Sequence, residues 1–318
     1  MSFSKKHIIQ FLQWILVIAA YAYLAYRLTI YDDWSSLGEH FSNAGIFQYL
    51  CILVAVLLFP VNILFESMKW RYLLKDIEPM SLREAQRQTY FGFIGAFLTP
   101  SRLGDYPARV TMMKNKNCWL EAIILGFIGT LALAFLQVMV GMPSCIIILE
   151  RVGGLRWVEW LCVGMLFLQI ITIVFYPILS RKISPKLEEG KLKNTLLVLS
   201  VFSYKRFFVT FLLSLLRYSV YCLQLWLVMY FCGVELGLHE AIVAIPAYYL
   251  LITVTPSVPV ADAAIRGSWS MVIFGLFSTN IAAIAISAVL LWVLNTILPM
   301  LIGSFLPHFS LRKKRFHP

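Results

Sequence analysis

The chain has 318 residues, of which 60% are hydrophobic and 14% charged, and its mean hydropathy is +0.79. An ordinary soluble domain carries about 25% charged residues, so this composition excludes a soluble globular protein and predicts a polytopic membrane protein. The net charge of +11 does not indicate nucleic-acid binding, because the basic residues are spread over separate segments and do not gather on one face.

Six apolar segments are long enough to cross a bilayer, which takes about 20 residues. In chain order they are residues 8–26, 46–65, 122–149, 161–180, 207–234 and 267–311. The first segment follows Lys5 and Lys6 like a signal peptide, but it is long and has no convincing small-residue cleavage site, so we predict a retained helix. The last segment is too long to be one helix across a bilayer.

The distribution of Lys and Arg predicts the orientation. Basic segments alternate with segments that are poor in Lys and Arg, which by the positive-inside rule places both termini in the cytoplasm. The basic segments are the N-terminus, 69–87, 114–116, 181–206 and the tail 306–318, and the poor ones are 31–45, 150–156 and 234–240. The sequence thus predicts a multi-pass protein of the cytoplasmic (inner) membrane with a basic cytoplasmic tail.

Two stretches separated by 156 residues resemble each other. Glu84-Ala85 and Thr99-Pro100-Ser101 recur as Glu240-Ala241 and Thr255-Pro256-Ser257, and an Asp-x-x-x-Arg sequence follows each copy. Paired apolar segments interrupted by proline at corresponding positions are typical of transporters built from inverted repeats. We therefore predict one transmembrane domain, residues 1–318, that contains inverted repeats over about 46–141 and 204–305.

Each copy has the features of a re-entrant hairpin. The apolar run 89–101 is short for a crossing, and the run 241–261 contains Pro246, Pro256 and Pro259, which we expect to break it. An odd number of crossings separates the two copies, so they should enter from opposite faces. The predicted fold is all-α, with about six full spans and two re-entrant hairpins, or eight or more spans if the hairpins cross completely.

Seven charged residues lie inside the apolar segments, where a charge is costly unless it lines a cavity or is paired. They are Glu66, Arg102, Asp105, Arg109, Arg217, Asp262 and Arg266. In one interpretation they bind a lipid head group near the tips of the hairpins, with Pro100, Gly104, Pro256 and Pro259 as hinge or helix-breaking positions, since arginine suits phosphate. In the alternative, the two Asp/Arg pairs at i,i+4 are structural ion pairs, and Glu66 snorkels beside Lys69.

The sequence resembles a known family at these residues. Glu66-x-x-Lys69-Trp70-Arg71-x-Leu73-Leu74 and Pro100-x-Arg102-x-Gly104-Asp105-x-x-x-Arg109 are similar to the transmembrane domain of lysylphosphatidylglycerol synthetases, the flippase half of the multiple peptide resistance factor. The resemblance covers about residues 8–305 and implies lipid translocation by inverted repeats. Two departures are the absence of a soluble aminoacyl-transfer domain after the last span, and Val258-Pro259-Val260 where a glycine-rich stretch is expected.

The predicted function is the flipping of a lipid whose head group contains an anionic or zwitterionic phosphate. The predicted partners are membrane lipids, and the sequence leaves a homo-oligomer open. Alternatives are an intramembrane enzyme that uses Glu66, Asp105 or Asp262 as a base, or a non-transporting assembly protein. No metal, nucleotide or other cofactor motif is present in the sequence, and no set of nucleophile, base and orienting residue appears.

Overall fold

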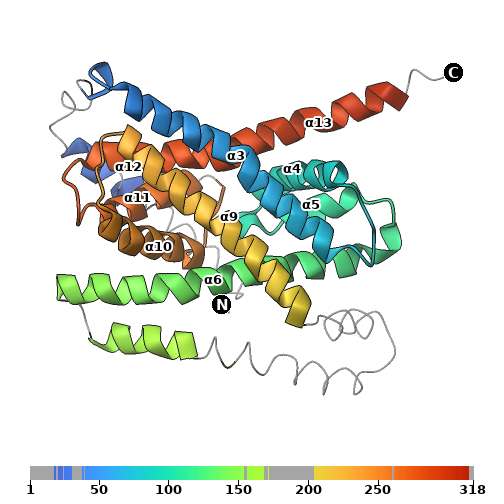
Figure 1. Ribbon diagram of the computed structural model, residues 1–318, viewed down its shortest axis with the longest axis horizontal. Coiled ribbons are helices and arrows are strands. Elements are labelled where there is room, and N and C mark those ends of the chain that lie inside the picture. Colours follow the sequence, from blue (N-terminus) through green and yellow to red (C-terminus); the bar gives the residue numbers. More distant parts are fainter. Residues whose placement is uncertain are drawn as a thin grey trace, which may run out of the picture.

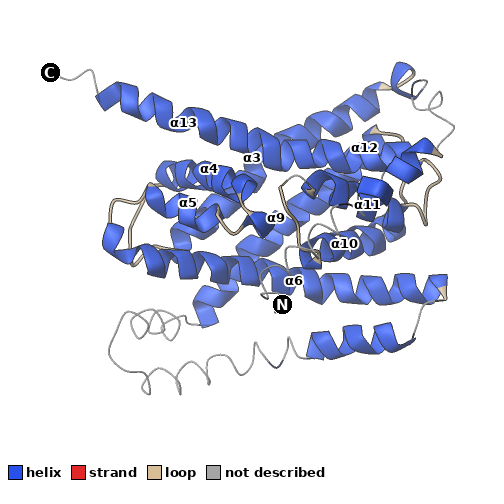
Figure 2. Ribbon diagram, turned by 180° about the vertical axis from the view of Figure 1, so that it is seen from behind, coloured by secondary structure: helices blue, strands red, loops and turns tan. Residues whose placement is uncertain are grey.

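A computed structural model describes residues 40–153, 156–167, 204–259 and 261–314, together with a few positions before residue 40 and residue 171; side chains are described as far as residue 306 (Figure 1). The described residues form helices and no strand (Figure 2), which confirms the all-α prediction. Much of the predicted spans 8–26 and 161–180, and the loop 181–203, lie outside the described residues.

The helices fall into two groups along the chain. The first contains α3 (Ile46–Leu73), α4 (Leu82–Leu98), η1 (Pro100–Arg102), α5 (Asp105–Thr111), η2 (Lys116–Cys118) and α6 (Trp119–Val152). The second contains α9 (Tyr204–Phe231), α10 (Leu238–Val254), α11 (Asp262–Phe274), α12 (Ile281–Trp292), the π-helix η4 (Val293–Ile297) and α13 (Leu298–Lys314).

In the part of the chain that the structure describes, four helical stretches are long and apolar enough to cross a membrane: Ile46–Leu73, Lys116–Val152, Lys205–Phe231 and Ile281–Leu306. The apolar segment 267–311 is divided between the end of α11 and the later helices, as its length predicts. Pro246, which we expected to break its segment, lies inside the continuous helix α10. A single proline removes one hydrogen bond, and the rest of this 17-residue helix keeps its hydrogen bonds.

The two groups match in the lengths and packing of their helices. α3 and α9 each have 28 residues, and α4 and α10 each have 17. α3 packs against α9, while α6 packs on α10 and α13 packs on α4. The last helix of each group, α6 or α13, therefore covers the 17-residue helix of the other group, α10 or α4.

Two glycines make corresponding close contacts in these crossed packings. A Cβ on Gly141 of α6 would lie 2.9 Å from the carbonyl oxygen of Pro246, and a Cβ on Gly303 of α13 would lie 2.3 Å from that of Tyr90. Small residues at such points let helix backbones approach closely, which is how helices pack in membranes. Tyr90 and Pro246 are again separated by 156 residues.

The short helices form two hairpins that point toward each other. α4 and α5 lie toward the end of the molecule where α3 ends and α6 begins, and α10 and α11 lie toward the opposite end (Figures 1 and 2). Both first helices begin with the same cap, in which Glu84 accepts a 2.9 Å hydrogen bond from the N–H of Ser81 and Glu240 accepts one of 2.9 Å from that of Gly237. Such caps satisfy otherwise unpaired N–H groups and set where each helix begins.

Candidate functional site

The tips of the two hairpins contact each other. The backbone N–H of Ser101 donates a 2.8 Å hydrogen bond to the carbonyl oxygen of Ser257. These serines close the two Thr-Pro-Ser copies, and both helices end before them, α4 at Leu98 and α10 at Val254. The duplicated sequence therefore supplies the contact between the hairpins.

The threonine of each copy holds its own hairpin together. The hydroxyl of Thr99 donates to the carbonyl of Gly95 (2.8 Å) and accepts from the N–H of Gly104 (2.7 Å). The hydroxyl of Thr255 donates to the carbonyl of Leu251 (2.6 Å) and accepts from the indole N–H of Trp269 (3.0 Å). In both hairpins one threonine hydroxyl thus links the end of the first helix to the segment that follows the tip.

The first tip has an unusual backbone. Ser101 has φ 49° and Arg102 has φ 59°, so two consecutive non-glycine residues adopt the left-handed conformation. Each such residue costs on the order of 1–3 kcal/mol, and strain of this kind concentrates at functional sites. Here it directs the side chain of Arg102 into the space between the hairpins.

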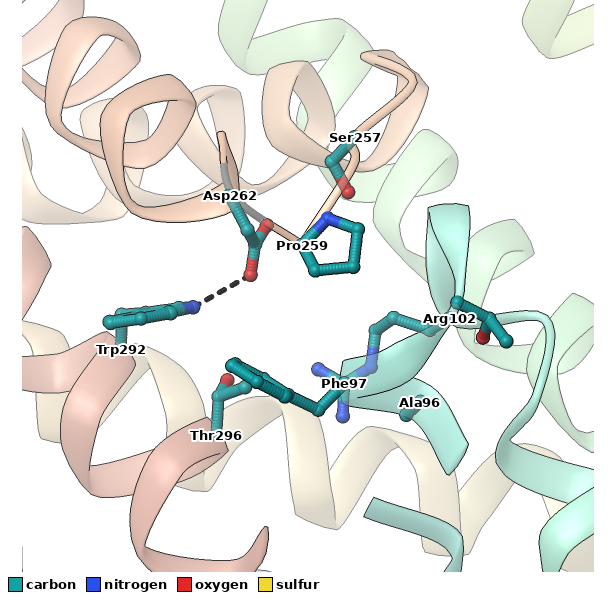
Figure 3. Close-up of a pocket in the computed structure, with 9 residues that line it drawn as sticks. Ala96, Phe97, Arg102, Ser257, Pro259, Asp262, Trp292 and Thr296 are labelled. Atoms are coloured by element: carbon teal, nitrogen blue, oxygen red, sulfur yellow. Dashed lines mark hydrogen bonds between the residues drawn. The ribbon is translucent and has the colours of Figure 1, made fainter. Parts of the chain in front are cut away.

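A small pocket lies between the tips and the π-helix (Figure 3). Arg102 reaches into it from the first tip and Asp262 from the second hairpin (Figure 3). Its cavity volume is about 20 Å³, which holds one water molecule but no lipid head group. The lining residues are Ala96, Phe97, Thr99, Arg102, Ser257, Pro259, Asp262, Trp292 and Thr296.

The side chain of Arg102 has no ion-pair or hydrogen-bond partner among the described residues. Its guanidinium carbon lies 5.3 Å from the centre of the Phe93 ring, a cation–π contact. Asp262, by contrast, is engaged: its Oδ2 accepts from the indole N–H of Trp292 at 2.7 Å and lies 3.2 Å from Nε of Arg266. The pocket therefore contains one cation without an ion-pair partner and one carboxylate that is already paired with an arginine.

Beside the pocket, Glu66 is the centre of a buried ion cluster. Its Oε1 lies 3.0 Å from Nη2 of Arg109, and its Oε2 lies 2.8 Å from Nζ of Lys69 and also contacts Nη1 of Arg217. Glu66 and Lys69 are 2% exposed and Arg109 is 1% exposed. Since Arg217 belongs to α9 and the others to α3 and α5, the cluster joins the two groups of helices.

Arg109 also pairs with Asp105 on its own helix, through hydrogen bonds of 2.6 and 2.9 Å. Its remaining nitrogen, Nη1, is buried without a hydrogen-bond partner. A buried guanidinium with an open donor is costly unless a ligand or water accepts from it. Nη1 of Arg109 can therefore still donate a hydrogen bond to one more anionic or polar group.

A chain of uncharged polar groups runs from this cluster to the π-helix. Arg217 donates to the side-chain oxygen of Asn62 at 2.8 Å, and Asn62 donates to Asn295 at 3.4 Å. Asn295 donates to Gln224 at 3.1 Å. π-helical turns inside α-helices frequently occur at functional sites, and this one contributes Asn295 to the network and Thr296 to the pocket.

A comparison with protein families identifies the family of this chain. The chain matches the family described as the lysylphosphatidylglycerol synthase TM region over residues 12–303. The chain belongs to this family. It is therefore a membrane protein of a lipid-handling family. A search of curated proteins found no match.

The structure brings the predicted site residues of this family member into two neighbouring sets. Glu66, Asp105, Arg109 and Arg217 share the ion cluster, and Arg102 and Asp262 line the pocket together with Pro259. Pro100, Gly104 and Pro256 lie in the tips, outside the α-helices. Arg266 pairs with Asp262 and does not line the pocket.

Sequence reasoning missed two members of the site. Lys69 was assigned to the cytoplasmic basic segment, but it is buried and paired with Glu66; its i,i+3 spacing from Glu66 was the available signal. Trp292, which binds Asp262, had no signal in the sequence. Asp105 and Asp262 are the first residues of α5 and α11, so the second helix of each hairpin begins with a carboxylate.

Proposed function

We propose that this protein moves a phosphate-containing lipid between the leaflets of the membrane, and that the head group passes between the two hairpin tips. The observation that carries the proposal is the guanidinium of Arg102, which has no ion-pair partner among the described residues. It is held in a strained backbone conformation beside the backbone hydrogen bond that joins the two Thr-Pro-Ser copies. Arginine binds phosphate through parallel hydrogen bonds.

The packing supports a mechanism of alternating access by inverted repeats. We assign the first repeat to about residues 46–141 and the second to about 204–305, and we infer that the hairpins re-enter from opposite faces of the membrane. Each repeat packs its last long helix on the short helix of the other repeat. Rocking of one repeat against the other would then open the tips to one side at a time.

The tips are closed in this structure, because the pocket holds no more than a water molecule. Admission of a head group requires that the Ser101–Ser257 hydrogen bond breaks and that the hairpins separate. The loss of one such bond costs about 0.5–1.5 kcal/mol, which thermal motion and ligand binding can offset.

Translocation of fluorescent phospholipids in proteoliposomes tests the proposal. Arg102→Gln should reduce translocation by at least about tenfold, because charged hydrogen bonds to a ligand contribute about 1.5–3 kcal/mol. It should leave the melting temperature unchanged, since no ion pair is lost. The matched control is Arg83→Gln, which removes an exposed arginine on the same hairpin. Equal translocation by both variants and the wild type would refute the role of Arg102.

An intramembrane enzyme is the second candidate, with Glu66, Asp105 or Asp262 as a base. All three carboxylates are engaged by cationic groups, and among the described residues no group of three or more His, Cys, Asp or Glu side chains could hold a metal ion. Incubation with radiolabelled phospholipid and analysis of the products decides between the two, because a transporter returns its lipid unchanged.

A further inference from the structure

The charges of the pocket and of the ion cluster do not balance. Five cationic side chains are present: Lys69, Arg102, Arg109, Arg217 and Arg266. Three carboxylates accompany them: Glu66, Asp105 and Asp262. Formally this leaves an excess of two positive charges at the site. Glu66, Lys69, Arg109 and Arg217 are buried and the other four groups are half-buried, and unpaired charges within apolar segments are costly.

The eight groups form one connected site. Tyr221 links its two parts, because its hydroxyl accepts a 3.1 Å hydrogen bond from Arg217 and lies within electrostatic range of Arg102. Arg102 is in turn within electrostatic range of Asp262. An anion bound at Arg102 would therefore lie next to the groups that connect the pocket with the ion cluster.

Open hydrogen-bond donors accompany the excess charge. The guanidinium of Arg102 and Nη1 of Arg109 have no hydrogen-bond partner, and Nε of Arg266 meets Asp262 in poor hydrogen-bond geometry. No carboxylate of the site is free to bind an ammonium group, since each already pairs with at least one cation. The site thus offers donors for oxygen atoms and nothing for a positively charged head group.

We propose that the preferred ligand is a lipid that ends in a phosphomonoester. This inference rests on the proposed function and specifies its substrate class. A phosphomonoester carries about −1.5 to −2 charges at pH 7 and presents three terminal oxygens, which match the excess of two positive charges and the open arginine donors. A phosphodiester has one negative charge, and a zwitterionic head group adds an ammonium that the site does not accommodate.

Binding of four probes to the purified protein in detergent tests the preference. They are dioctanoyl phosphatidate, dioctanoyl phosphatidylglycerol, dioctanoyl phosphatidylethanolamine and glycerol 3-phosphate, measured by calorimetry. We expect phosphatidate to bind at least about tenfold more tightly than either phosphodiester, because a second charge interacts with the same cations. Glycerol 3-phosphate should bind much more weakly, since it lacks acyl chains.

Arg102→Gln should reduce the affinity for phosphatidate to about that for phosphatidylglycerol, whereas Arg83→Gln should change neither. Equal affinities of phosphatidate and phosphatidylglycerol in the wild type would overturn the proposed preference. Equal affinities of phosphatidate and glycerol 3-phosphate would overturn a lipid ligand in favour of a soluble organic phosphate.

Translocation of the same lipid classes in proteoliposomes distinguishes a failure of the proposed lipid preference from a failure of the proposed transport function. Movement of phosphatidylglycerol at the rate of phosphatidate, together with equal affinities, refutes the preference and retains the transporter. Absence of movement for every lipid refutes the proposed function, while the binding constants still decide which phosphate the site recognises.

Discussion

The 2.8 Å hydrogen bond from the N–H of Ser101 to the carbonyl of Ser257 joins the two Thr-Pro-Ser copies of the chain. It places equivalent residues of the two hairpins against each other. Contact between equivalent residues is what a two-fold axis through that point would produce. The tips are thus the natural position of a gate between two similar halves.

A disulfide between the tips should lock this gate. The 2.8 Å backbone hydrogen bond holds Ser101 and Ser257 close together, and a disulfide joins residues whose Cα atoms are about 4.4–6.8 Å apart. We expect the double variant Ser101→Cys/Ser257→Cys to form a disulfide on mild oxidation and to lose lipid translocation, with recovery on reduction. Each single cysteine variant is the control. Full translocation in the oxidised double variant would show that the tips do not separate.

The sequence alone predicted the helical class, the breaks after Leu98 and Val254, and the pairing of Asp105 with Arg109 and of Asp262 with Arg266. These features depend on local signals, namely apolar runs, proline positions and i,i+4 spacing.

The contacts between distant segments of the site could not be predicted from these local signals. Glu66 is separated from Arg217 by 151 residues, and no local pattern specifies that they meet. The burial of Lys69 could not be distinguished from a position at the membrane interface, because both follow an apolar segment. Pro246 was expected to break a helix that continues through it, since intact neighbouring hydrogen bonds outweigh the one that proline removes.

Asp105→Asn distinguishes a functional from a structural ion pair. Arg109 keeps Glu66 as a partner in this variant, and asparagine still accepts one hydrogen bond. We therefore expect a loss of about 1–2 kcal/mol in the free energy of unfolding and a clear increase in affinity for anionic lipid, because Arg109 has lost a competing carboxylate. Lipid binding and thermal unfolding are measured on the same preparation. A large loss of stability with unchanged affinity per folded molecule would instead identify a structural pair.

Gly92→Ala should displace the Asp105–Arg109 ion pair, because the added methyl group would collide with it. The added Cβ would lie 2.2 Å from Oδ1 of Asp105 and 2.7 Å from Nε of Arg109, so the paired side chains, or α5 with them, must shift away from α4. Overpacking of this kind costs about 1–3 kcal/mol, and lipid translocation should fall with it. Gly164→Ala is the matched control, because nothing lies within 4 Å of its added Cβ. The idea fails if both alanines are equally tolerated in thermal unfolding and transport.

Glu66→Gln should expose the excess of positive charge most directly. The variant leaves Lys69, Arg109 and Arg217 with Asp105 as the one nearby carboxylate, and removal of one partner from a buried ion cluster typically costs about 3–5 kcal/mol. An anionic lipid that reaches these cations would replace the missing charge. We therefore expect phosphatidate to raise the melting temperature of this variant more than that of the wild type.

Glu84→Gln is the control for that experiment. Glutamine preserves the helix cap at Ser81 and removes only the exposed ion pair with Lys114, which is worth about 0–1 kcal/mol. This variant should match the wild type both in stability and in its response to lipid. If phosphatidate stabilises the wild type and Glu66→Gln by the same amount, the lipid phosphate does not reach the Glu66 cluster, and binding is confined to the pocket at Arg102.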